Sequence, residues 1–96
     1  MSPDKRKKLV ILRKKLDLLD NKLLKLIKIR TNIVKNVLKL KTYKHEIVDK
    51  KRISKILNNI KDKSIKNKID PKITNRIWKN MISAYIDFER RNFKKK

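Results

Sequence analysis

The feature that most constrains the fold is an amphipathic run from about residue 8 to 42 that no proline or glycine interrupts. Its apolar positions recur at alternating spacings of four and three, the pattern of a helix that packs lengthwise against other helices. The seam comprises Leu12, Leu16, Leu19, Leu23, Leu26, Arg30, Ile33, Val37 and Leu40. At 1.5 Å per residue, the run predicts a helix roughly 50 Å long.

Two shorter helices are predicted after this run, over residues 49–60 and 71–92. Asp49 is a candidate N-cap for the first of them, and Asp70 followed by Pro71 places a cap and a first-turn proline at the start of the second. The basic segment "KDKSIKNKI" is expected to connect them. Because no segment shows the alternation typical of a strand, the sequence predicts a single all-α domain of three helices over residues 1–96.

The long seam cannot be covered by the rest of its own chain. Two short helices are too small to cover a helix of roughly 50 Å. A chain of 96 residues is also close to the size at which a small domain needs oligomerisation to bury enough apolar surface. The sequence therefore predicts a homodimer with paired long helices.

The charge balance favours an anionic partner, since 31 Lys and Arg residues stand against 9 Asp and Glu, a net charge of +22. A chain rich in Lys, Ile and Asn can also arise from codon bias acting on a tolerant surface. One Trp, two Tyr and two Phe provide few stacking side chains, and no zinc-ligand set is present. A basic helical module that binds nucleic acid remains an alternative, but nucleic acid is not expected as the primary partner.

Compartment and redox chemistry are constrained by two further features. The chain has no cysteine, which excludes disulfides and thiol chemistry. The start "MSPDKRKKLVILRKK" contains only four consecutive apolar residues, too few for a signal-peptide core or a spanning helix. We expect a cytoplasmic protein without a membrane partner.

Arg30 is the one charged residue in the seam. Its guanidinium does not lose its proton, so an apolar setting is costly unless an anion meets it there. Lys41 returns to within about 20° of the same face, roughly 16 Å along the axis, so both side chains can converge on a small ligand. The alternative is that Arg30 extends toward solvent and pairs with an acidic residue of another helix.

Glu89 is a similar anomaly of opposite sign. It continues an otherwise apolar stripe in the third predicted helix. The stripe consists of Trp78, Ile82 and Tyr85. Glu89 is either a structural partner of Arg30 or a second wall of the same pocket.

Four segments together resemble the small all-helical chorismate mutases, from about Leu9 to Glu89. They are "LRKKLDLLDNKLLKLIKIR", Lys41, "IVDKKRISKIL" and "IWKNMISAYIDFE". The most specific part is the spacing Arg-x6-Asp-x9-Arg-x10-Lys, followed by Asp-x2-Arg. The resemblance implies an intertwined homodimer of the shikimate pathway and aromatic amino acid biosynthesis. It also implies rearrangement of the dianion chorismate to prephenate without a cofactor or metal.

The resemblance assigns roles to the most distinctive charged residues. Arg30 corresponds to the arginine that grips a substrate carboxylate, and Lys41 to the lysine directed at a carboxylate and the breaking ether oxygen. Glu89 stands where a glutamine often donates to that oxygen. Arg13 corresponds to an arginine that the other subunit contributes to the site. This role is consistent with its position, about 25 Å along the helix from Arg30 and about 100° around it, which is too far for one small ligand to contact both in one chain.

The resemblance places the remaining residues at the edge of the pocket. Arg52 is a supporting cation, and Val37 and Ile82 are apolar walls. Asp49 lies near the substrate's ring hydroxyl, although it is equally well explained as a helix cap. Tyr85 replaces a small polar residue that is common in the mutases.

Three departures from the family pattern affect the expected chemistry. Ile53, where many members have a glutamate, cannot accept a hydrogen bond from the substrate hydroxyl. Glu89 can donate only when it is protonated, so activity is expected to rise toward acidic pH. With Tyr85, the third predicted helix resembles that of the related isochorismate pyruvate lyases, which makes lyase activity an alternative function.

Overall fold

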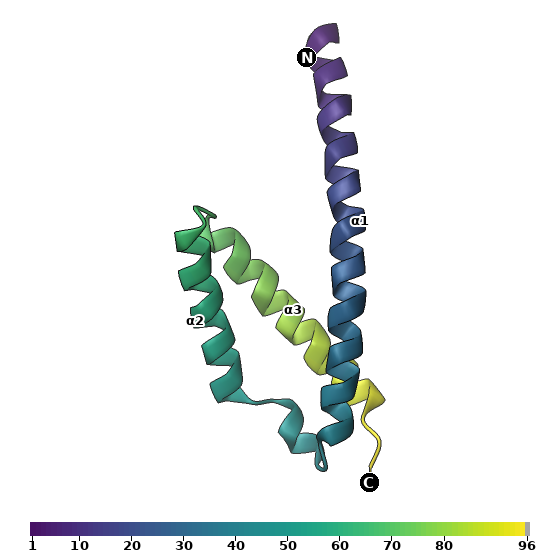
Figure 1. Ribbon diagram of the computed structural model, residues 1–96, viewed down its shortest axis with the longest axis vertical. Coiled ribbons are helices and arrows are strands. Elements are labelled where there is room, and N and C mark those ends of the chain that lie inside the picture. The colour runs from purple at the N-terminus through teal and green to yellow at the C-terminus, as the bar shows by residue number, and fades with distance from the viewer. Residues whose placement is uncertain (96) are drawn as a thin grey trace. The chain divides into compact units, whose positions relative to one another are not determined.

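The computed structural model describes residues 1–95 as an all-helical chain. Its elements are the α-helix α1 (Pro3–Leu40), the 3-10 helix η1 (Lys44–Ile47), and the α-helices α2 (Lys50–Lys66) and α3 (Pro71–Asn92) (Figure 1). The described part contains no strand, so the prediction of an all-α fold with three α-helices is confirmed. None of the helices within residues 1–95 combines the length and apolar character that a membrane span requires.

The chain divides into two compact units, which we call the N-terminal unit (Met1–Ile33) and the C-terminal unit (Val34–Lys96). The N-terminal unit contains most of α1. Ser2 precedes this helix, and its Oγ accepts a hydrogen bond from the Lys5 backbone N–H at 3.3 Å. Pro3 occupies the first helical position. The expected start near residue 8 was therefore wrong, because a cap followed by proline begins the helix earlier.

Apolar side chains of the N-terminal unit are widely exposed. Beyond Met1, the exposed residues are Val10, Ile11, Leu12, Leu16, Leu18, Leu19, Leu23, Leu24, Leu26, Ile27, Ile29 and Ile33. A helix in a folded protein normally turns such a face toward a core. The N-terminal unit does not supply that core from its own residues.

The C-terminal unit is built on an antiparallel pair, α2 and α3, which are joined by a short turn and contact each other (Figure 1). Near the turn, the hydroxyls of Ser64 and Thr74 lie 2.7 Å apart and are buried. Ser64 Oγ also donates to the Ile60 carbonyl at 2.6 Å. A buried hydroxyl needs such partners, so these bonds stabilise the crossing of the two helices.

The starts of both helices follow the sequence signals. Asp49 caps α2 by accepting from the Arg52 N–H at 3.0 Å. Asp70 caps α3 by accepting from the Lys72 N–H at 2.9 Å, and Pro71 follows it. Both predicted caps are confirmed, because in each case a short acidic side chain satisfies an otherwise unpaired amide of the first turn.

The end of α2 differs from the prediction, since the helix continues to Lys66 instead of ending at residue 60. Its termination depends on Lys68, whose backbone is left-handed with φ of 57°. The Ile69 N–H donates to the Ser64 carbonyl at 2.9 Å, and the Lys68 N–H donates to the Ile65 carbonyl at 3.1 Å. This is a Schellman motif. Its usual glycine is absent, so no residue in the sequence marked the end.

The end of α1 (residues 34–40) and the short η1 complete the C-terminal unit. The long helix ends at Leu40, two residues earlier than expected. Leu38 is buried near its end, and Ile47 in η1 is 4% exposed. Because η1 contacts α3, the segment after α1 is held against that helix.

Candidate functional site

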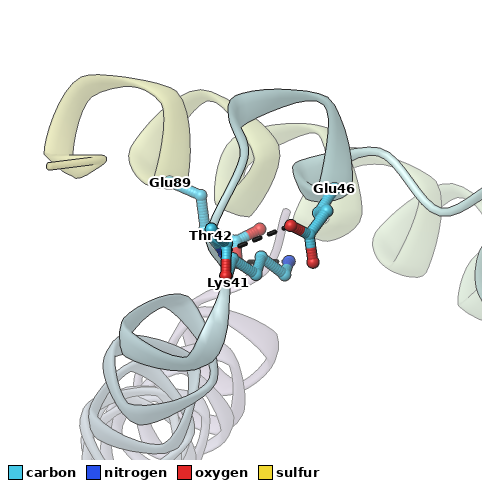
Figure 2. Close-up of polar contacts among 4 residues, drawn as sticks. All are labelled: Lys41, Thr42, Glu46 and Glu89. Atoms are coloured by element: carbon cyan, nitrogen blue, oxygen red, sulfur yellow. Dashed lines mark hydrogen bonds and ion pairs between the residues drawn. The ribbon is translucent and has the colours of Figure 1, made fainter. Parts of the chain in front are cut away.

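The C-terminal unit brings two of the predicted site residues into direct contact. Lys41 Nζ donates to Glu89 Oε1 at 2.9 Å (Figure 2). The side chains are only 18% and 8% exposed, so water screens this ion pair less than a surface pair. A charge-assisted hydrogen bond of this length is one of the stronger polar contacts in a protein. The site therefore has a shielded cation next to a shielded carboxylate.

Lys41 occupies the first position after α1, and the local backbone explains why the helix stops there. The Lys41 N–H donates to the Leu38 carbonyl at 3.1 Å, three residues back instead of the four of an α-helix. The next two amides, of Thr42 and Tyr43, donate to Glu46 Oε1. This carboxylate accepts hydrogen bonds from amides that would bond to backbone carbonyls if the α-helix continued. The helix therefore ends at Leu40, and Lys41 lies just outside it.

Glu89 lies on α3 with two other predicted site residues. Ile82, Tyr85 and Glu89 recur at spacings of three and four, which places them on one face of the helix. Ile82 and Tyr85 are half-buried. The Tyr85 ring meets Phe88 edge-on, with centroids 6.5 Å apart and an interplanar angle of 84°. This face combines a carboxylate with an apolar wall and a phenol.

Asp49 and Arg52 come together at the start of α2. The Asp49 carboxylate accepts the Arg52 backbone N–H, so the explanation of Asp49 as a helix cap is correct. Both side chains are exposed. Val37, the predicted wall residue on α1, is 44% exposed in the C-terminal unit. Contact of these three residues with substrate remains a prediction.

Arg13 and Arg30 belong to the N-terminal unit. Within α1, Arg30 is half-buried and Arg13 is exposed. The helix carries both at the positions that the sequence spacing predicted. Their assignment to substrate carboxylates stays a prediction.

Sequence reasoning missed both the partner of Lys41 and the role of Glu46. Lys41 and Glu89 are 48 positions apart, and the helical pattern relates residues only within one helix. The one signal for Glu46 was its position three residues after Tyr43, where an acidic side chain can reach back to a free amide. His45 is exposed and stacks on Tyr43 with centroids 5.4 Å apart.

The arrangement is suited to binding an anion. An ammonium group has three N–H donors, so Lys41 can bond to an incoming oxygen while it keeps a bond to Glu89. No group of three or more His, Asp or Glu side chains within residues 1–95 is placed to hold a metal ion.

Comparison with known protein families gives a match over most of the chain. A family model described as chorismate mutase type II matches residues 12–90. This range includes all the predicted site residues, from Arg13 to Glu89. No curated protein and no solved structure matches the chain.

Proposed function

The chain belongs to the type II chorismate mutase family, and we propose that it rearranges chorismate to prephenate. In this reaction one carbon–oxygen bond breaks while a carbon–carbon bond forms in the same molecule. No nucleophile, general base or cofactor takes part. The protein has to hold the compact reactive conformation and stabilise the negative charge that grows on the ether oxygen.

The observation that carries this proposal is the shielded pair of Lys41 and Glu89, 2.9 Å apart. We assign Lys41 to a substrate carboxylate and to the ether oxygen, since a shielded ammonium stabilises developing negative charge more strongly than an exposed one. When the dianion binds, Lys41 shares its donors between the substrate and Glu89.

Glu89 is proposed as the hydrogen-bond donor to the ether oxygen. Its place next to Lys41 brings both groups to the same reacting atom. A carboxyl group donates only in its protonated form. Turnover is therefore expected to rise toward acidic pH, and an amide at this position is expected to donate at every pH.

The remaining assignments rest on the sequence motif and the family match. Arg30 is proposed to hold the second substrate carboxylate, bidentately where the geometry allows. Arg13 is proposed to act from the other subunit, and Arg52 to support the anion at the edge of the pocket. Asp49 is proposed to lie near the ring hydroxyl in addition to capping α2.

A homodimer is proposed because the seam of the N-terminal unit is uncovered. Leu12, Leu16, Leu19 and Leu23 are each more than half exposed. Apolar residues of α1 occupy an arc of roughly 280° at 100° per residue, wider than one neighbouring helix covers. Contact with several helices of a second copy, as in an intertwined dimer, would bury such an arc.

Tyr85 supports isochorismate pyruvate lyase activity as the second candidate. Its ring is half-buried and shares a helix face with Glu89, so a phenol lies on the face proposed to meet substrate. The same cations would hold isochorismate, which is also a dianion.

Product identification separates these functions. The purified protein is incubated with chorismate and with isochorismate separately, and the products are identified by NMR. Prephenate from chorismate supports the proposal, whereas pyruvate from isochorismate as the main product supports the lyase. If neither compound changes and the protein binds arbitrary DNA duplexes in a salt-sensitive way that Arg30→Ala leaves intact, the nucleic-acid module is supported instead.

A further inference from the structure

The segment between α1 and α2 contains a carboxylate that holds the backbone next to Lys41. Glu46 Oε1 accepts the Thr42 N–H at 3.1 Å and the Tyr43 N–H at 2.8 Å. Figure 2 shows Lys41 and Thr42 between Glu46 of η1 and Glu89 of α3. One carboxylate oxygen thus fixes the first two amides that follow the lysine.

We propose that Glu46 is a positioning residue that sets the place of Lys41 for the anionic substrate. This inference rests on the proposed function, because it matters for turnover only if Lys41 meets substrate. Glu46 does not itself touch the substrate in this account. It acts through the backbone at residues 42 and 43.

The reason lies in how a lysine is positioned. Its four-carbon side chain is flexible, so the place of its ammonium depends on where the backbone holds its Cα. After Leu40 the backbone leaves α1, and beyond that point its amides need other partners. Glu46 provides one carboxylate for two of them, with charge-assisted hydrogen bonds.

Glu46 also connects Lys41 to the helix that carries its partner. It lies in η1, next to Ile47, which is 4% exposed. Because η1 contacts α3, the hydrogen bonds from the two amides to Glu46 hold the backbone after α1 at a fixed position relative to Glu89. Displacement of a catalytic group by about 1 Å can lower the rate by roughly 100-fold. A smaller effect, about fivefold to tenfold in kcat/KM, is expected here because Glu46 is exposed and its removal loosens the segment without unfolding it.

The chain offers a matched control in Asp70. This carboxylate also caps a helix by accepting a backbone N–H, that of Lys72 at 2.9 Å, and it is exposed like Glu46. It lies at the start of α3, about 28 Å along that helix from Glu89. Removal of the Asp70 carboxylate destabilises the first turn of α3, at a site remote from Lys41.

The experiment compares Glu46→Ala, Glu46→Gln and Asp70→Ala with the wild type at a temperature at which all are folded by circular dichroism. Amide hydrogen exchange is measured at Thr42 and Tyr43, and kcat/KM is measured with chorismate. Glu46→Ala is expected to speed exchange at both amides at least tenfold and to lower kcat/KM about fivefold to tenfold. Glu46→Gln keeps an acceptor oxygen, and it is expected to stay within about twofold of wild type, as is Asp70→Ala.

Three results would overturn the proposal. The first is unchanged amide exchange at Thr42 and Tyr43 in Glu46→Ala. The second is faster exchange at these amides in Glu46→Ala with kcat/KM still within about twofold of wild type. The third is a loss of kcat/KM in Asp70→Ala equal to that in Glu46→Ala. If the wild-type protein does not convert chorismate, the proposed function fails, and with it the role of Glu46 in turnover. The exchange data still decide separately whether Glu46 holds the backbone.

Discussion

The two units of the chain obtain their stability in different ways. None of residues 1–33, all of which the structure describes, is buried, whereas five of the described residues 34–95 are buried. These are Leu38, Ile47, Ser64, Thr74 and Glu89. The N-terminal unit is a helix with an exposed apolar seam, and an isolated helix is only marginally stable in water. The contrast indicates that the first unit depends on contacts from outside itself, while the second orders its polar groups internally.

This contrast also bears on function, because the proposed substrate contacts come from both units. Lys41 and Glu89 are held within the C-terminal unit, so their geometry depends mainly on that unit. Arg13 and Arg30 are carried by the N-terminal unit, so their contribution is expected to depend on association. The predictions below separate these two kinds of dependence.

The largest effect is expected at Lys41. Lys41→Gln keeps a hydrogen-bond donor for the buried Glu89 and removes the positive charge. It is expected to lower kcat/KM by about 100-fold to 1,000-fold, the usual range for losing one group that stabilises the transition state. Steady-state kinetics give the loss, and circular dichroism and sedimentation check that fold and association are unchanged. Activity within tenfold of wild type would mean that Lys41 is not at the reacting centre.

The next effect concerns association of the N-terminal unit. Leu19→Glu places a charge in the exposed seam, and it is expected to weaken the dimer at least 100-fold, about 2.7 kcal/mol. Lys28→Glu is the control, since it lies about 180° around the helix from Leu19. Sedimentation equilibrium measures both variants. Equal weakening by the two substitutions would show that net charge, not the seam, governs association.

A smaller effect is expected from Glu89→Gln. In the wild type, kcat/KM is expected to be higher at pH 5 than at pH 8, because a carboxyl group donates only in its protonated form. The variant is expected to vary by less than about threefold over that range, because an amide donates at every pH. Parallel pH profiles provide the test. A flat wild-type profile would remove Glu89 from the role of donor.

The smallest effect tests the local ordering of the C-terminal unit. Lys68 has φ of 57° at the end of α2, a conformation that glycine adopts at little cost. Lys68→Gly is expected to stabilise the protein by about 0.5 kcal/mol, which raises the melting temperature by about 2–4 °C. Lys61→Gly, at an exposed position inside α2, is the control and is expected to destabilise the protein by about 1 kcal/mol. Destabilisation by both would contradict the assigned helix end.

Sequence patterns predicted what depends on neighbours along the chain. The seam of α1, the cap at Asp49 and the cap with proline at Asp70 are local signals, and all three helices are present as α-helices. The end of α2 was missed because Lys68, an ordinary lysine, takes the place of the expected glycine. The burial of Ser64 was also not predicted, because the last turn of α2 is otherwise polar and the partner of Ser64, Thr74, lies on α3.

The candidate site was predictable in its residues but not in its contacts. The positions of Arg13 and Arg30 along α1, and of Lys41 directly after it, were visible in the sequence. The contact of Lys41 with Glu89 depends on how α1 ends and how η1 meets α3, which no periodicity encodes. Glu46 was overlooked for the same reason, since its function depends on a turn and not on a repeating pattern.

The central claim is that two copies of the chain build each site together, and subunit mixing tests it most directly. Arg13→Ala and Lys41→Gln are purified separately, shown to be nearly inactive, and then mixed in equal amounts under conditions that allow subunit exchange. In a mixed dimer one site contains the intact Lys41 of one chain and the intact Arg13 of the other. The account predicts recovery of about a quarter of wild-type activity, because about half of the dimers are mixed and each has one intact site. Activity that stays at the level of the separate variants, although exchange is demonstrated, would contradict it.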